Sequence, residues 1–130
     1  MERMNKPYFY YLPACLCALT ICALSTSATV HMPKISWFQV DKLWHFLAYA
    51  FFHLVIVWGM ANQQKWQKIH WYFVLLSLGI VSLYGALMEW VQYLMPERLF
   101  DYADMTANVA GAIFGSLCIP FLFRFLKIRQ

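Results

Sequence analysis

Long apolar runs separated by short polar segments dominate the pattern of this chain. Four runs are long enough to cross the hydrocarbon of a bilayer, which takes about 20 apolar residues in a helix. They cover about residues 8–27, 43–60, 69–94 and 102–126. No linker, repeat or low-complexity segment divides them. The pattern predicts an all-α membrane bundle of four transmembrane helices, which forms a single domain over residues 1–130.

The composition favours a membrane protein over a soluble one. Hydrophobic residues make up 62% of the chain and charged residues only 12%, whereas soluble domains carry about 25% charged residues. A chain of 130 residues cannot bury this much apolar surface in one small core. We therefore expect membrane lipid to be the main partner.

The first run has a second interpretation. Arg3 and Lys6 before it, and the small residues 25–28 after it, resemble the ends of a secretory signal peptide. The run is long for a signal peptide, however, and Pro13 interrupts it. We favour a retained transmembrane helix and keep cleavage as the alternative.

The charged residues predict the orientation of the bundle. In a four-helix topology, seven of the ten Lys and Arg residues fall on the side of the two termini, and five of the six acids fall on the other side. Because basic loops stay in the cytoplasm, we expect both termini to be cytoplasmic. The basic residues then face anionic lipid, and we expect no nucleic-acid partner.

Polar residues recur on one face at the start of the second run. Asp41, His45 and Tyr49 are spaced by four residues, which places them along one side of a helix, with Lys42 beside them. Asp41 also stands where a helix N-cap is expected. His45 and Tyr49 could alternatively be interfacial residues with polar tips. The spacing still directs three polar side chains to one end of the bundle.

The third run carries Glu89 and Gln92 near its end. Glu89 precedes Pro96 by seven residues, which is about 10 Å at 1.5 Å per helical residue. An acid at the bilayer centre costs about 2.5–3.5 kcal/mol on insertion scales, and less near the interface. A salt bridge or a functional site must offset this cost, and both alternatives remain open.

The fourth run begins with a polar stripe. Asp101, Asp104 and Asn108 share one helical face. An acid in the first turn favours the helix dipole, which alone would explain Asp101 but not Asn108.

Small residues continue along the same helix. Ala107, Gly111 and Gly115 form a seam at which another helix can approach closely. We expect this seam to bring Asp104 and Asn108 against the helix that carries Glu89.

These residues resemble the motif of the VanZ-like family of small bacterial integral membrane proteins. The matching segments are Asp41-Lys42-x-x-His45-Phe46-x-x-Tyr49, Glu89-x-x-Gln92, and Pro96-x-Arg98-x-x-Asp101-x-x-Asp104-x-x-x-Asn108-x-x-Gly111. The resemblance covers about Val40 to Gly115. It implies a multi-pass protein of the inner (cytoplasmic) membrane with an important outer-face pocket, and a link to teicoplanin (glycopeptide) resistance. It implies no particular reaction.

Three functions fit the predicted pocket. In the first, it binds a lipid headgroup or another amphiphile through residues that offer charge or hydrogen bonds: Asp41, Lys42, Tyr49, Gln92, Arg98, Asp101 and Asn108. In the second, the chain is a membrane enzyme for a lipid-linked substrate, with Glu89 or Asp104 as general acid or base and His45 as their partner. In the third, the cluster is a structural salt-bridge network.

The sequence leaves the cofactor open. The acids could hold a divalent cation through oxygen ligands, but their spacing matches no known metal motif. The four cysteines lie in apolar runs without a histidine at metal-ligand spacing, so we expect them to be small hydrophobic residues and predict no metal site.

Overall fold

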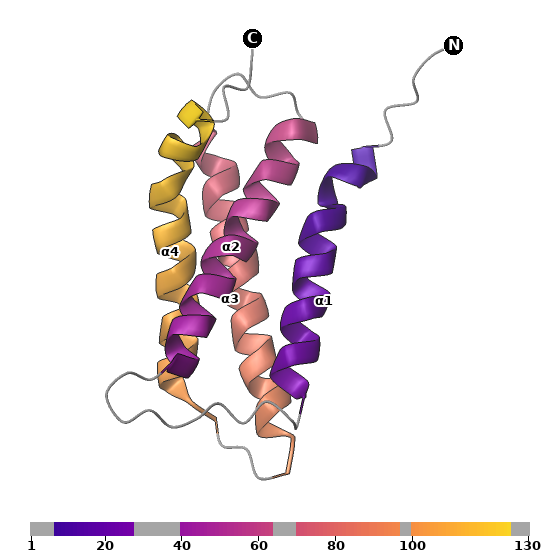
Figure 1. Cartoon of the computed structure of the whole chain (residues 1–130), viewed down its shortest axis with the longest axis vertical. Coiled ribbons are helices and arrows are strands. Elements are labelled where there is room, and N and C mark those ends of the chain that lie inside the picture. Colours follow the sequence, from indigo (N-terminus) through magenta and orange to yellow (C-terminus); the bar gives the residue numbers. More distant parts are fainter. Residues whose placement is uncertain (1–6, 28–39, 64–69, 97–99, 126–130) are drawn as a thin grey trace.

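The computed structural model describes residues 7–27, 40–63, 70–96 and 100–125, and within these ranges every regular element is helical. A 3-10 turn, η1 (Pro7–Tyr11), leads into α1 (Leu12–Thr26), and α2 (Val40–Gln63), α3 (Trp71–Tyr93) and α4 (Tyr102–Phe125) follow. The helices lie side by side (Figure 1). All four are long and apolar enough to cross a membrane, which confirms the predicted class and the four spans.

Polar residues account for the differences between predicted and observed helix ends. Helix α2 begins at Val40 rather than near Leu43, and Lys42 in its first turn is paired with Asp101 and Asp104. The prediction that Asp41 is the N-cap is therefore wrong, since this residue lies inside the first turn. Pro13 does not interrupt α1, because it lies at the helix start, where its missing N–H breaks no helical hydrogen bond.

Helices α2 and α4 make the closest contact in the bundle. A Cβ atom at Gly111 would lie 2.1 Å from the backbone oxygen of Phe46, and one at Gly115 would lie 2.8 Å from that of Ala50. Only glycine permits such an approach of two backbones. The two glycines therefore face α2. The expected contact of Asp104 and Asn108 with α3 is also present: a Cβ atom at Gly85 would lie 3.2 Å from Asn108, and Asp104 is an electrostatic neighbour of Glu89.

Helix α1 lies at one edge of the bundle (Figure 1). It contacts α2 and α3 within the described residues. Two side chains of α3 hold it: the Tyr84 hydroxyl donates to the Ala18 carbonyl at 2.7 Å, and the Gln92 amide donates to the Ser25 carbonyl at 3.1 Å. Many large apolar side chains remain exposed on all four helices, as is expected of surfaces that face lipid.

Candidate functional site

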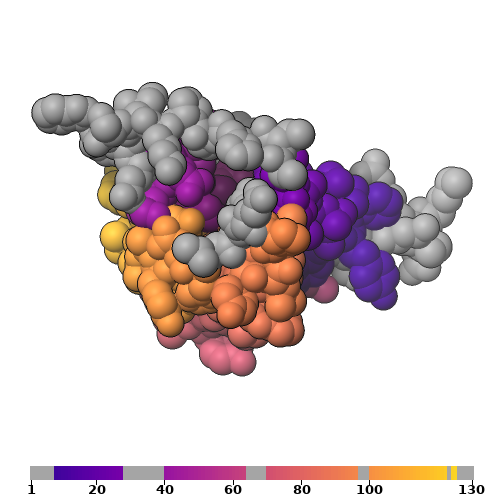
Figure 2. All heavy atoms as spheres, turned by 90° about the horizontal axis from the view of Figure 1, so that it is seen from below, coloured from indigo at the N-terminus to yellow at the C-terminus, as the bar shows by residue number. Residues whose placement is uncertain are grey.

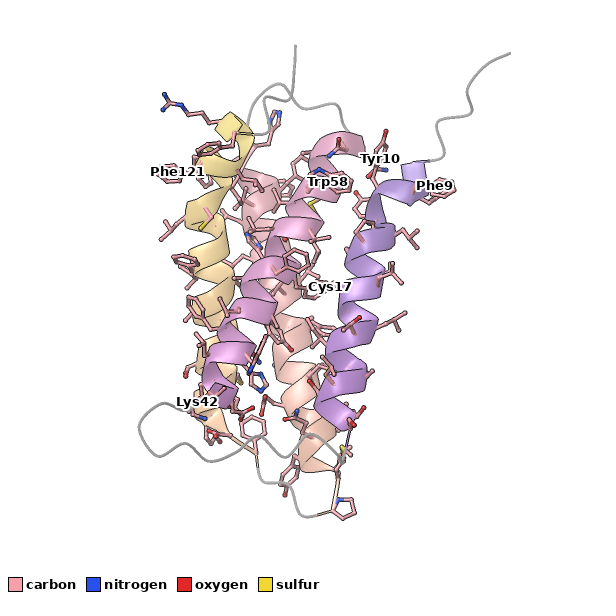
Figure 3. All side chains as sticks on the ribbon, viewed as in Figure 1. Phe9, Tyr10, Cys17, Lys42, Trp58 and Phe121 are labelled. Atoms are coloured by element: carbon pink, nitrogen blue, oxygen red, sulfur yellow. The ribbon has the colours of Figure 1, made fainter. Side chains whose placement is uncertain are left out.

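Charged and polar side chains gather at the end of the bundle where α2 and α4 begin and α3 ends. Figure 2 views the molecule from this end, where α2, α3 and α4 meet. In Figure 3, Lys42 lies at this end, far from Tyr10 and Trp58 at the other. We call the following seven residues the polar cluster: Asp41, Lys42, His45, Glu89, Asp101, Asp104 and Asn108.

Lys42 joins α2 to the start of α4. Its ammonium group lies 2.8 Å from Asp101 Oδ2 and 2.7 Å from Asp104 Oδ1. The other oxygen of Asp101 accepts the backbone N–H of Ala103 at 2.7 Å, so Asp101 is the N-cap of α4. The hydrogen bond from Lys42 also holds the pKa of the Asp101 carboxyl below its usual value. One lysine thus fixes the cap of α4 against the first turn of α2.

His45 lies between an amide and two carboxylates. Its Nδ1 is 3.0 Å from Asn108 Oδ1. Its Nε2 is 3.7 Å from Asp41 Oδ1 and 3.8 Å from Asp104 Oδ2. If Nδ1 carries the proton, it donates to Asn108, and the lone pair of Nε2 points between the two acids.

Glu89 completes the cluster from α3 and is only 1% exposed. Its electrostatic neighbours include Asp104, His45 and the backbone of Asp101. Within the described residues, Glu89 Oε1 and Asn108 Nδ2 are buried without a hydrogen-bond partner. Buried polar atoms are nearly always hydrogen-bonded, so the network is incomplete in the described part of the chain.

The remaining predicted site residues have different surroundings. Tyr49 is buried, and its ring lies 6.5 Å from that of His45 and 6.4 Å from that of Tyr84, measured between centroids. The Gln92 amide is bonded to α1, as described above. Arg98 lies outside the residues that the structure describes. The structure therefore brings together the charged members from α2, α3 and α4 and leaves Arg98 unplaced.

A second buried polar group was missed by sequence reasoning. His53 on α2 is fully buried, with Ser77 Oγ 3.0 Å from Nδ1 and Ser116 Oγ 2.9 Å from Nε2. Ser116 donates its proton to the Ala112 carbonyl at 3.2 Å, so Nε2–H donates to Ser116 and Nδ1 accepts from Ser77. A neutral imidazole is then fully satisfied.

This histidine had a signal in the sequence. It continues the four-residue spacing of Asp41, His45 and Tyr49 by one more turn. We did not predict it because it stands inside a long apolar run, and its serine partners lie on two other helices.

Removing the hydroxyl of Ser77 should destabilise the bundle. Ser77→Ala leaves Nδ1 of the buried His53 without a donor, and we expect the free energy of unfolding to fall by about 1–2 kcal/mol. Chemical denaturation of the purified protein in detergent micelles measures this change. Ser82→Ala on the same helix is the matched control, because the Ser82 side chain makes no hydrogen bond within the described residues. Equal effects of the two substitutions would contradict the role of Ser77.

Comparison with known proteins identifies one family. A model of the VanZ/LLP1 family matches residues 9–124, a stretch that includes α1 to α3, all but the last residue of α4 and the whole polar cluster. No curated protein and no solved structure matches the chain.

Proposed function

The chain belongs to the VanZ/LLP1 family, and from this starting point we propose that it is a bacterial envelope protein whose polar cluster binds the head of a membrane amphiphile. The ligand is a lipid headgroup or a lipid-tailed glycopeptide such as teicoplanin. In this proposal both termini are cytoplasmic, and the cluster lies at the outer face of the inner membrane. The distribution of Lys and Arg along the sequence supports this orientation.

The unpaired atoms of the polar cluster carry the proposal. Glu89 Oε1 can accept a hydrogen bond and Asn108 Nδ2 can donate one, and neither does so within the described residues. An amphiphile places its polar head at the membrane interface and its tail along the lipid-facing helices. A headgroup at this end of the bundle would supply both missing partners, and its tail would lie beside exposed apolar side chains.

The charges of the cluster constrain how a headgroup would bind. The Lys42 ammonium is already shared by Asp101 and Asp104, so Lys42 is a poor independent site for an anion. An anionic headgroup therefore depends on Arg98, whose guanidinium suits phosphate and carboxylate geometry.

Removing Arg98 should release the bound amphiphile. We expect Arg98→Ala to weaken phospholipid retention through purification at least about tenfold, because loss of one partner of a desolvated charge pair costs about 2 kcal/mol or more. Mass spectrometry of lipid co-purified from vesicles of phosphatidylethanolamine and phosphatidylglycerol measures retention. Arg124→Ala is the matched control, since Arg124 is exposed at the opposite end of the bundle. Equal retention by both variants would remove the proposed anchor.

A membrane enzyme is the second candidate, and the surroundings of His45 favour it. An amide on one ring nitrogen and two carboxylates near the other resemble an oriented acid–base group. Glu89 or Asp104 would then transfer protons with His45, and Arg98 would stabilise negative charge. Glu89→Gln distinguishes the candidates, because an enzyme would lose its effect on teicoplanin susceptibility of cells while lipid retention and expression stay normal.

A further inference from the structure

Three metal-ligand atoms converge in the polar cluster. Asp41 and Asp104 each offer a carboxylate oxygen and His45 offers a ring nitrogen, and these atoms all lie within 4.8 Å of one another. They come from two helices, α2 and α4, whose backbones touch only a short distance away at Gly111. The three ligands are therefore attached to the most tightly packed pair of helices in the bundle.

The unpaired oxygen of Glu89 is independent evidence for a ligand site beside Asp104 and His45. The side chain is buried to all but 1%, its carboxylate interacts with Asp104 and His45, and Oε1 has no partner within the described residues. Acids within membranes are rare and are normally paired. The carboxylate has a hydrogen bond from the backbone of Asp101, but Oε1 has none within the described residues, so this oxygen is free to bind a cation.

We propose that Asp41, His45, Glu89 and Asp104 bind one divalent transition-metal ion, Zn²⁺ or Mn²⁺. Mixed carboxylate and imidazole ligands suit these ions, whereas Mg²⁺ and Ca²⁺ prefer oxygen alone. The site stands on these side chains. The ion takes the place of the headgroup as the partner of Glu89 Oε1, and Asn108 Nδ2 stays available to the headgroup.

The hydrogen bond of His45 favours the tautomer and ring orientation that a metal ligand needs. Its Nδ1 lies 3.0 Å from Asn108 Oδ1, so a proton on Nδ1 leaves the Nε2 lone pair free between the two aspartates. Histidine ligands typically donate their second ring N–H to a carbonyl in this way, which fixes the tautomer and the ring orientation.

The size of the site fits a single ion after a small adjustment. Ligand atoms about 2.1 Å from one tetrahedral ion lie about 3.4 Å apart. The distances from His45 Nε2 to Asp41 and Asp104, 3.7 and 3.8 Å, are slightly longer than this spacing. Asp41 must move toward the other two ligands, and its side chain is 57% exposed and can rotate.

The charge balance also favours an ion. Four carboxylates in the cluster face one ammonium, that of Lys42, within the described residues. A protonated His45 would explain its two carboxylate contacts, but it would add a single charge and leave Glu89 Oε1 unpaired. A divalent ion supplies two charges and a partner for Glu89.

Titration of the chelator-stripped, full-length protein in detergent with ZnCl₂ or MnCl₂ tests the proposal by calorimetry. We expect one ion per chain and a metal-dependent rise in Tm, since a ligand that binds only the folded state stabilises it. Asp41→Asn should lower the affinity at least about tenfold without unfolding the protein, because Asp41 is exposed. His45→Gln should lose stoichiometric binding, and the exposed His70, as His70→Gln, should bind like the unaltered protein.

Three results would overturn the site. One is the absence of stoichiometric binding for both ions. Another is full affinity in both Asp41→Asn and His45→Gln. The third is an equal loss in His70→Gln, which would assign the binding to surface histidines. Loss of lipid retention with metal binding intact would instead count against the headgroup proposal alone, so the two failures are distinguishable.

Discussion

Gly111→Leu should prevent assembly of the native bundle. Even a Cβ atom at this position would lie 2.1 Å from the Phe46 oxygen and 2.8 Å from its carbonyl carbon. Those atoms are backbone, so no side-chain rotation relieves the clash, and α2 and α4 must separate. Overpacking of a core typically costs about 1–3 kcal/mol and sometimes more. We expect at least about 3 kcal/mol here, seen as a large fall in Tm in detergent micelles.

Gly79→Leu is the matched control for this substitution. A Cβ at Gly79 has no neighbour within 4 Å, and the residue is exposed on α3. Leucine has a higher helix propensity than glycine and suits a lipid-facing surface, so stability should be unchanged or slightly higher. If the Gly111→Leu variant had the same Tm as the Gly79→Leu variant, the backbone contact between α2 and α4 would not be needed for stability.

Lys42→Met should destabilise the protein by about 2–4 kcal/mol. Removing one member of a buried ion pair costs about 3–5 kcal/mol, because the remaining charge is left unpaired. The Asp104 side chain is 9% exposed and that of Lys42 is 24% exposed, so we place the loss slightly below that range. Equilibrium unfolding in micelles at neutral pH measures it.

A second substitution tests whether the lost stability comes from the charge left unpaired. Lys42→Met combined with Asp104→Leu removes both charges, and we expect it to recover most of the stability lost in the single variant. Asp101→Asn is the control, because that carboxyl is half-exposed and asparagine also caps helices. It should cost no more than about 1 kcal/mol. A double variant as unstable as Lys42→Met alone would refute the charge-pair explanation.

The sequence allowed the four spans and most of the polar cluster to be predicted. Transmembrane length and helical periodicity are local properties, so the positions of Asp41, His45, Asp104 and Asn108 along their helices followed directly. Glu89 was selected because an acid inside an apolar run is costly. The structure places its carboxylate beside Asp104 and His45.

Properties that depend on helix neighbours were not accessible in the same way. The seam at Gly111 and Gly115 was recognised, and Asn108 lies against α3 as expected, but nothing local tells that the two glycines face α2. His53 was missed for a related reason: its serine partners Ser77 and Ser116 are 24 and 63 residues away in the chain. Hydrogen bonds between side chains of different helices can be identified only once the arrangement of the helices is known.

The polar face of α2 has a consequence for biogenesis. Its partners on α4 are encoded 59 to 63 residues later, from the Lys42–Asp101 pair to the His53–Ser116 pair. At about 5–20 residues per second, α2 waits several seconds during synthesis before these groups emerge. During that interval Lys42, His45 and His53 lack their α4 partners. We therefore expect α2 to enter lipid together with α4 rather than before it.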